Sequence, residues 1–224
     1  MFSPFLRKPF KQAVKAGVIP ASLATIAGTW GAVSDQGDLT YLNLIHLSAD
    51  GTDPADLTRG EMEGRRQAVH AVEALRQFMP GCEGAKLRNF GMTLGIRDTR
   101  KIDARYNMTA SDVREQGRFD DSIGIFPEFI DGYGLLILPT TGRYFHVPYR
   151  ALLPQGVQGL LVAGRSIGGD KVSHAAVRNM MCCAVSGQGA GTAAAVAFKL
   201  DQPFDRLDIG QVQAELRRQG ARLA

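Results

Sequence analysis

The feature that most constrains this chain is a short apolar run followed by a long stretch of small residues. Residues 159–164 read Gly-Leu-Leu-Val-Ala-Gly. A continuous apolar run of this length, ended by glycine, is typical of a parallel strand that is buried on both faces. Residues 175–200 are mostly Ala, Val, Met, Cys and Gly. Such a stretch predicts a helix that is buried on all sides.

The loop between these two elements, residues 165–173, follows a Gly-Arg turn and leads into the start of the helix near His174. In doubly wound folds, ligands bind at the carboxyl ends of parallel strands, where helix N-termini offer free N–H groups and a partial positive charge. The segment therefore predicts a cradle for an anion or an electron-rich heterocycle. A buried core helix without a ligand explains the same spacing, and the spacing alone does not decide between the two.

Composition excludes several classes of protein. With 45% hydrophobic and 21% charged residues, the chain is neither disordered nor a coiled coil. Its 224 residues are enough for a sizeable core and for one or two domains. The net charge of +4 names no partner. Because basic pairs such as Arg65-Arg66 and Arg217-Arg218 are scattered, we expect solvated or ion-paired arginines rather than a nucleic-acid-binding surface.

Cysteine usage and the N-terminal region bear on the compartment. Cys82, Cys182 and Cys183 have neither the spacing of metal ligands nor a histidine at ligand distance. We therefore expect no metal site and a reducing compartment, the cytoplasm. Basic residues precede a fairly apolar stretch at 18–33, which is the outline of a signal peptide. Pro20 and several Gly, Ser and Thr residues interrupt that stretch, so we expect neither a signal peptide nor a membrane-spanning helix.

Local signals predict the remaining elements. Helices are expected where one face is apolar or a capping pattern is present: 4–17, 59–79 after the capping box Thr58–Glu61, a short helix from the capping box Thr109–Asp112 to Gln116, and a C-terminal helix between Asp208 and Gly220. Strands are expected where apolar residues alternate or run together: 38–47, 86–97, and a hairpin of 134–138 and 144–149 joined by 140–142, with a strand and turn over 25–34. A domain boundary is expected near Pro154-Gln-Gly156.

Several motifs, taken in order, resemble a known family. The segments Leu160–Arg165, Ser173–Met180 and Gly187–Ala195 resemble the C-terminal end of the FAD-dependent oxidoreductases of the glutathione-reductase-like superfamily. Gly95–Arg100 is similar to the Gly-x-Arg-Glu-Ser/Thr-Arg segment of one branch, described simply as FAD-dependent oxidoreductase. Further matches to that branch extend the likeness over essentially the whole chain: 53–61, 119–123 and 147–154.

The sequence departs from the family in one respect. Members open with a strand, Gly-x-Gly-x-x-Gly and a helix, which bind the FAD pyrophosphate, and this sequence holds no such segment. The run Gly187-Gln-Gly-Ala-Gly191 lies inside an expected helix and follows no strand, so we reject it as a phosphate loop. The resemblance therefore implies FAD as the cofactor, with the missing half on a partner chain or lost by truncation.

The resemblance also implies the fold class and the domains. The expected class is α/β, with an α+β substrate domain and the last strand and helix of a doubly wound FAD-binding domain. The substrate domain would cover 1–153, the returning FAD-domain strand and buried helix 154–200, and a C-terminal helix 201–224.

The same resemblance assigns cofactor-binding residues. One set would lie at the end of the last strand and along the start of the following helix: Gly164, Arg165, Ser173, Ala176, Val177 and Arg178. The backbone N–H groups of residues 176–178 would stabilise negative charge on the flavin pyrimidine edge. The alternative reading of Arg165 is a surface arginine that follows a core strand.

Three side chains are the candidate catalytic residues. By the resemblance, His174 would lie near the flavin ring and act as an acid or base on the substrate. Arg97 and Arg100 would line the substrate or flavin side, since arginine suits bidentate binding of a carboxylate. The alternatives are a packing or capping histidine, and arginines that pair with nearby aspartates such as Asp98.

Three functions compete at this point. The first is the C-terminal half of an FAD-dependent oxidoreductase that transfers hydride between flavin and a small, anionic substrate. The second is a non-catalytic structural subunit or truncated relic that binds no flavin by itself. The third is a basic domain that binds nucleic acid, against which stands the lack of an aromatic stacking platform among the basic residues.

Overall fold

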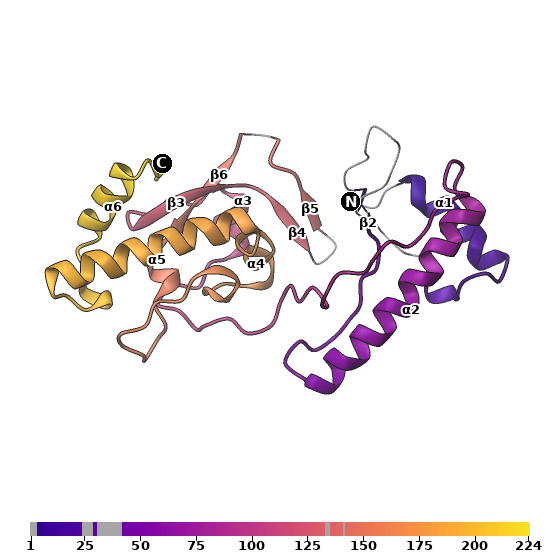
Figure 1. The fold of residues 1–224 in the computed structure, drawn as a ribbon. Helices are drawn as coiled ribbons and strands as arrows, with labels where there is room; N and C mark the ends of the chain where they lie inside the picture. The colour runs from indigo at the N-terminus through magenta and orange to yellow at the C-terminus, as the bar shows by residue number, and fades with distance from the viewer. Residues whose placement is uncertain (1–3, 24–28, 31–41, 133–134, 141) are drawn as a thin grey trace. The chain divides into compact units, whose positions relative to one another are not determined.

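The computed structural model describes residues 4–23, 29–30, 42–132, 135–140 and 142–224. The chain forms two compact units, Met1–Ile96 and Arg97–Ala224, and each is described by itself (Figure 1). The domain boundaries expected at 153/154 and 200/201 stay a prediction. The 3-10 helices are short: Ala21–Leu23, Tyr149–Leu152, Gly164–Ser166 and Phe204–Arg206.

Two helices make the core of the first unit. Helix α1, Pro4–Lys15, confirms the amphipathic helix expected over 4–17, and it packs against α2, Pro54–Phe78 (Figure 1). Phe10 of α1 and Leu75 of α2 are buried in their contact, whereas Lys11 of α1 is exposed. Burial of one apolar face per helix is what the spacing of apolar residues predicts.

Helix α2 begins five residues before the expected start at 59. Asp53 is its N-cap, because the Asp53 side chain accepts a hydrogen bond of 2.9 Å from the backbone N–H of Ala55. Pro54 follows at the first helical position, where a missing N–H costs nothing. The expected capping box at Thr58 is wrong, since the Thr58 hydroxyl donates to the carbonyl of Pro54 inside the helix, 2.9 Å away.

Two expected strands of the first unit are short or absent. Strand β1, Thr29–Trp30, pairs antiparallel with β2, Leu42–Asn43. Of the strand expected over 38–47, residues 38–41 lie outside the described residues, as does most of 25–34. The strand expected over 86–97 is wrong: these residues form no strand, and most are exposed. No described strand runs beside them to supply the ladder that a strand needs.

The second unit contains two antiparallel strand pairs. Strand β3, Ser122–Pro127, pairs with β6, Tyr144–Pro148, and β4, Ile130–Gly132, pairs with β5, Leu135–Ile137. The expected hairpin of 134–138 with 144–149 is therefore wrong. Pairing of β3 with β6 places Phe126 opposite Phe145, with ring centres 6.0 Å apart, and buries both rings. Local turn signals cannot foresee this pairing, because β3 precedes the predicted hairpin in the chain.

Two short helices of this unit follow their capping signals. Helix α3, Ala110–Arg114, has the capping box predicted at Thr109, with reciprocal bonds between Thr109 and Asp112. Helix α6, Ile209–Arg218, is capped by Asp208, whose side chain accepts from the N–H of Gly210 at 2.9 Å. Gly220, with φ of +82°, follows the end of α6, where a left-handed residue is favoured.

The apolar run at 159–164 is not a strand among the described residues. Its backbone bonds back to the fold from the N–H of Val162 to the carbonyl of Leu152 and from the N–H of Gly164 to the hydroxyl of Ser186, each at 2.9 Å. Leu160 is 45% exposed. A buried parallel strand needs a neighbouring strand on each side, and no described strand flanks this run. The doubly wound sheet expected in this part of the chain is therefore not formed by the described residues.

The expected helix over 175–200 is two helices. Helix α4, Lys171–Val177, and α5, Met180–Leu200, are separated at Arg178 and Asn179. Helix α5 packs across β3 and against α6 (Figure 1). A Cβ on Gly189 would lie 2.5 Å from the Ile123 side chain, so glycine is what permits this close approach.

Helix α5 is not buried on all sides, contrary to the sequence prediction. Met180 is 88% exposed and Phe198 is 89% exposed, whereas Cys182 and Ala193 are fully buried. By length and composition alone, α5 could cross a membrane. The same properties occur in core helices, and one side of α5 lines the core of the second unit.

Candidate functional site

The expected end of the cofactor strand is a turn anchored to α5. Gly164 has φ of +77°, and its N–H donates to the Ser186 hydroxyl at 2.9 Å. The Ser186 hydroxyl donates in turn to the carbonyl of Cys183 at 3.0 Å. The next residue, Arg165, is exposed. The Gly-Arg turn is therefore held close to the start of α5.

Ser173 has a structural role in this arrangement. It is fully buried, its hydroxyl donates to the carbonyl of Met108 at 2.8 Å, and its N–H donates to the Asp170 carboxylate at 2.7 Å. The same carboxylate accepts from the N–H of Ala110 at 2.7 Å. Asp170 thus caps the start of α4 and ties it to the start of α3. The start of α4 is therefore already capped by the Asp170 side chain.

His174 lies inside the fold. Its side chain is 1% exposed, and its buried Nδ1 atom has no hydrogen-bond partner among the described residues. Its Nε2 atom lies 3.7 Å from a carboxylate oxygen of Asp98, which also pairs with Lys101 at 2.6 Å. Burial lowers the pKa of His174, and Lys101 and Arg178 lower it further against the opposing effect of Asp98. The imidazole is thus held neutral, and its position favours the alternative of a packing histidine.

Arg97 and Arg178 meet at one carboxylate. Asp131 of β4 lies 2.6 Å from the Arg97 guanidinium, and its Oδ2 atom lies 3.8 Å from the Arg178 guanidinium. Arg178 also donates to the backbone carbonyl of Asp131. Arg100, in contrast, is exposed and forms no ion pair with a described residue. The structure brings Arg97 and Arg178 together and leaves Arg100 apart.

Residues 176–178, whose N–H groups were expected to be free at a helix start, lie instead at the C-terminal end of α4. Ala176 and Val177 are buried at the end of α4, and the N–H of Arg178 donates to the carbonyl of His174 at 3.0 Å. The free helix start in this region belongs to α5. Its N-cap residue, Asn179, makes no side-chain capping bond.

The first N–H groups of α5, at residues 180–182, therefore have no acceptor within the helix. This helix start was not predicted from the sequence. The sequence does contain a signal for it, because Arg178 and Asn179 interrupt the apolar stretch and asparagine is a favoured N-cap residue.

The charges around the start of α5 are positive. Burial raises the pKa of the Cys183 thiol, while the nearby Arg165 and Arg178 act in the opposite direction. A helix N-terminus and two guanidinium groups suit the electron-rich pyrimidine edge of a flavin. The described residues fit that end of FAD, whereas they hold no strand, glycine-rich loop and helix in sequence that would fit its pyrophosphate. The run 187–191 lies inside α5, as expected.

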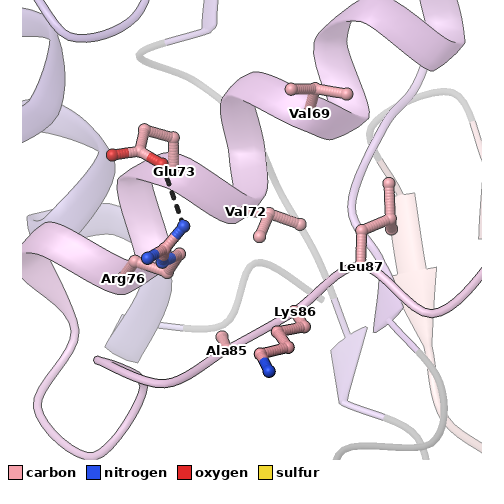
Figure 2. A pocket seen from close by; sticks show the side chains of 7 residues that line it. All are labelled: Val69, Val72, Glu73, Arg76, Ala85, Lys86 and Leu87. Carbon is pink, nitrogen blue, oxygen red and sulfur yellow. Dashed lines mark ion pairs between the residues drawn. The ribbon is translucent and has the colours of Figure 1, made fainter.

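A cavity of about 280 Å³ lies in the first unit, on the side of α2 that faces residues 85–87 (Figure 2). Its lining is mostly apolar, with an ion pair of 3.7 Å between Glu73 and Arg76 at its edge. None of the predicted site residues lines it; the lining residues are Val69, Val72, Glu73, Arg76, Ala85, Lys86 and Leu87. Across the part of the chain that the structure describes, no three His, Cys, Asp or Glu side chains are grouped to hold a metal ion.

Comparison with protein families settles the assignment. The family model described as FAD dependent oxidoreductase matches residues 12–216. The chain belongs to this family. The match covers both compact units, including every predicted site residue. Comparisons with curated proteins and with solved structures give no match.

Membership in the FAD dependent oxidoreductase family implies an enzyme and suggests FAD as its cofactor. The family also suggests an α/β fold, while the described residues form helices and small antiparallel sheets.

Proposed function

We propose that this chain is the C-terminal half of an FAD-dependent oxidoreductase and transfers hydride between a small anionic substrate and flavin. The observation that carries the proposal is the uncapped start of α5 beside the guanidinium groups of Arg165 and Arg178. That start lies in the segment 173–180, one of the segments whose likeness to the family is most specific. A positive, hydrogen-bond-donating start is the environment that a flavin pyrimidine edge needs.

When bound, FAD accepts a hydride from a substrate C–H bond or returns it. The N–H groups at the start of α5 would donate to the pyrimidine edge and stabilise the negative charge that grows there on reduction. The cofactor contacts expected at residues 176–178 thus move to the backbone N–H groups of residues 180–182. Arg97 would orient an anionic substrate, and His174 would support the fold from inside rather than move a proton.

We further propose a partner that carries the strand, Gly-x-Gly-x-x-Gly and helix of the FAD-binding half. Two observations support it. The apolar run 160–163 has no neighbouring strand among the described residues, and Leu160 in it is 45% exposed, so the run could pair with a strand of a partner. Helix α5 also exposes three large apolar side chains: Met180, Met181 and Phe198. Exposed apolar surface of this kind marks contact sites. The reduced cysteines fit a cytoplasmic setting, which is part of the same proposal.

A second candidate is a non-catalytic subunit or relic that keeps the fold and binds no flavin. The complete burial of His174 favours it, because the only predicted acid–base side chain is closed to a substrate in this structure. The two candidates differ in one measurable property, the retention of flavin by the complex with the partner.

The test is to co-express the chain with a polypeptide that carries the missing half and to measure the flavin absorbance of the purified complex. We expect a flavin band, and a large loss of that band when Arg165→Gln is introduced. Arg217→Gln is the matched control, because Arg217 is an exposed arginine in the last turn of α6 and is none of the predicted site residues. A soluble complex without flavin would overturn the proposal in favour of the second candidate.

A further inference from the structure

Arg97 and Arg178 share one internal carboxylate, that of Asp131. Arg178 is fixed: its side chain is 9% exposed, and its guanidinium donates to the carbonyl of Asp131. Gly132 lies against it, since a Cβ there would be 3.5 Å from the Arg178 guanidinium. Arg97 is 45% exposed and pairs with Asp131 at 2.6 Å. One buried and one half-exposed arginine therefore hold a carboxylate between them.

Several charged groups lie around this carboxylate. Arg178 acts electrostatically on both His174 and Cys183, so the neighbouring charges belong to the same region. Among the described residues that these interactions name, the carboxylates are Asp98 and Asp131, and the cations are Arg97, Lys101, Arg165 and Arg178. Burial raises the pKa of Asp131, but its bond to Arg97 and the charges of both arginines lower it more, so the net pKa is below its usual value. The two arginines thus favour a charged carboxylate at this position.

We propose that the Asp131 carboxylate occupies the place of a substrate carboxylate, which displaces it from Arg97 and Arg178 on binding. That the bound carboxylate belongs to a substrate rests on the function proposed above, whereas the binding of a carboxylate at this site does not. Arg178 would then lie between the substrate carboxylate and the start of α5, which it precedes in the chain. A planar carboxylate suits two guanidinium groups, which donate in fixed directions to its two oxygens.

Exchange of one carboxylate for another is feasible at this site. The ion pair between Arg97 and Asp131 is exposed on both sides, at 45% and 35%, and exposed pairs are worth little in water. A ligand carboxylate recovers the interaction with Arg97 and lies within reach of the Arg178 guanidinium, as the Asp131 carboxylate does at 3.8 Å. Asp131 can rotate toward solvent, where its charge is fully hydrated.

The first test uses the unmodified chain and sodium acetate as the probe. NMR reports on the arginine Nε–H groups and on the carboxyl carbon of Asp131 during the titration. We therefore follow both signals at neutral pH, where acetate is ionised, and expect the Arg97 signal and the carboxyl carbon of Asp131 to shift together with the same midpoint as acetate takes the place of Asp131. A shift of the Arg97 signal without any shift of the Asp131 carboxyl carbon would refute the displacement.

The second test removes the competing charge. Asp131→Asn should tighten acetate binding at least about fivefold, which corresponds to about 1 kcal/mol. Asp205→Asn is the matched control, because Asp205 pairs with a single arginine, Arg105, at 3.0 Å and also accepts from it at its carbonyl. Arg97→Gln should abolish binding in the Asp131→Asn background.

Three results would overturn the proposal: equal affinity of the unmodified chain and Asp131→Asn, an equal gain in Asp205→Asn, or tight binding of inorganic phosphate with no binding of acetate. The last would mean that the site takes a phosphate group of a nucleotide. None of these measurements needs flavin, so a colourless complex would refute the proposed function and leave the carboxylate site standing. Conversely, a flavin-containing complex that does not bind acetate would refute only the site.

Discussion

Two glycines of α5 provide a sharp test of how that helix packs. A Cβ on Gly189 would lie 2.5 Å from the Ile123 Cδ1 atom and 2.9 Å from the Ile123 Cβ atom, which is held by the backbone of β3. A Cβ on Gly187, two residues away in the same helix, would meet nothing within 4 Å. Alanine at either position therefore brings the same gain in helix propensity, but only alanine at position 189 disturbs the packing against Ile123.

The expected magnitudes follow from these distances. Replacing glycine by alanine inside a helix stabilises it by about 1 kcal/mol, so Gly187→Ala should raise the free energy of unfolding by up to that amount. At Gly189 the same gain is opposed by overpacking, which costs about 1–3 kcal/mol in a well-packed core. Gly189→Ala should therefore unfold about 1–3 kcal/mol more easily than Gly187→Ala, because the propensity gain cancels in the comparison.

Urea denaturation of the two variants, followed by circular dichroism, measures this difference as a change in midpoint at constant slope. Equal stabilisation of both variants would refute the packing of α5 on β3 and, with it, the placement of the candidate site. Gly191→Ala is an additional control, since a Cβ at Gly191 also meets nothing within 4 Å.

Three further predictions concern a helix cap and two histidines of the second unit and the thiols of the whole chain. Thr109→Ala removes one side of the capping box of α3 and should cost about 1 kcal/mol of unfolding free energy, measured by the same denaturation assay; a change near zero would contradict the box. Burial lowers the pKa of His146 and of His174 below 6.5, so the unfolded chain binds more protons and the free energy of unfolding should fall as pH drops through 6.5. That slope should shrink in His174→Gln, and an unchanged slope would show that His174 is solvated. Cys182 is fully buried, and burial raises the pKa of its thiol, so iodoacetamide should label the partly exposed Cys82 while Cys182 stays unmodified; peptide mass spectrometry reads the outcome, and prompt labelling of Cys182 would contradict its burial.

The sequence was sufficient where the signal is local. The capping box at Thr109–Asp112, the cap at Asp208 and the glycine after α6 depend on residues within one helical turn, and the structure confirms all three. At α2 two local signals competed, and the Asp53-Pro54 pair prevailed over Thr58 because it lies earlier and closes the first turn.

The sequence was insufficient where strands pair with distant partners. The run 159–164 has the composition of a buried strand, yet no described strand flanks it. The segment β6 pairs with β3 rather than with β5, because the Phe126 and Phe145 side chains bury one another. Strand pairing is decided by side-chain contacts across the sheet, which periodicity along one strand does not report.

In the candidate site, too, contacts between residues close in sequence could be predicted and contacts between distant residues could not. Sequence motifs placed Gly164 and Arg165 near the helix that follows, and the Gly164 bond to Ser186 supports that proximity. The pairing of Arg97 with Asp131 spans 34 positions of the sequence, so it could not be read from nearby aspartates such as Asp98. The free start of α5 was missed because the apolar stretch was taken as one helix.

We propose that this member of the FAD dependent oxidoreductase family binds the flavin end of FAD and that a partner chain binds the phosphate end. The visible absorbance spectrum of the purified chain, first alone and then in complex with the partner half, separates the possible outcomes. We expect a colourless chain alone and a flavin band in the complex. A flavin band from the chain alone would contradict the need for a partner, and a complex without flavin would contradict the site at the start of α5.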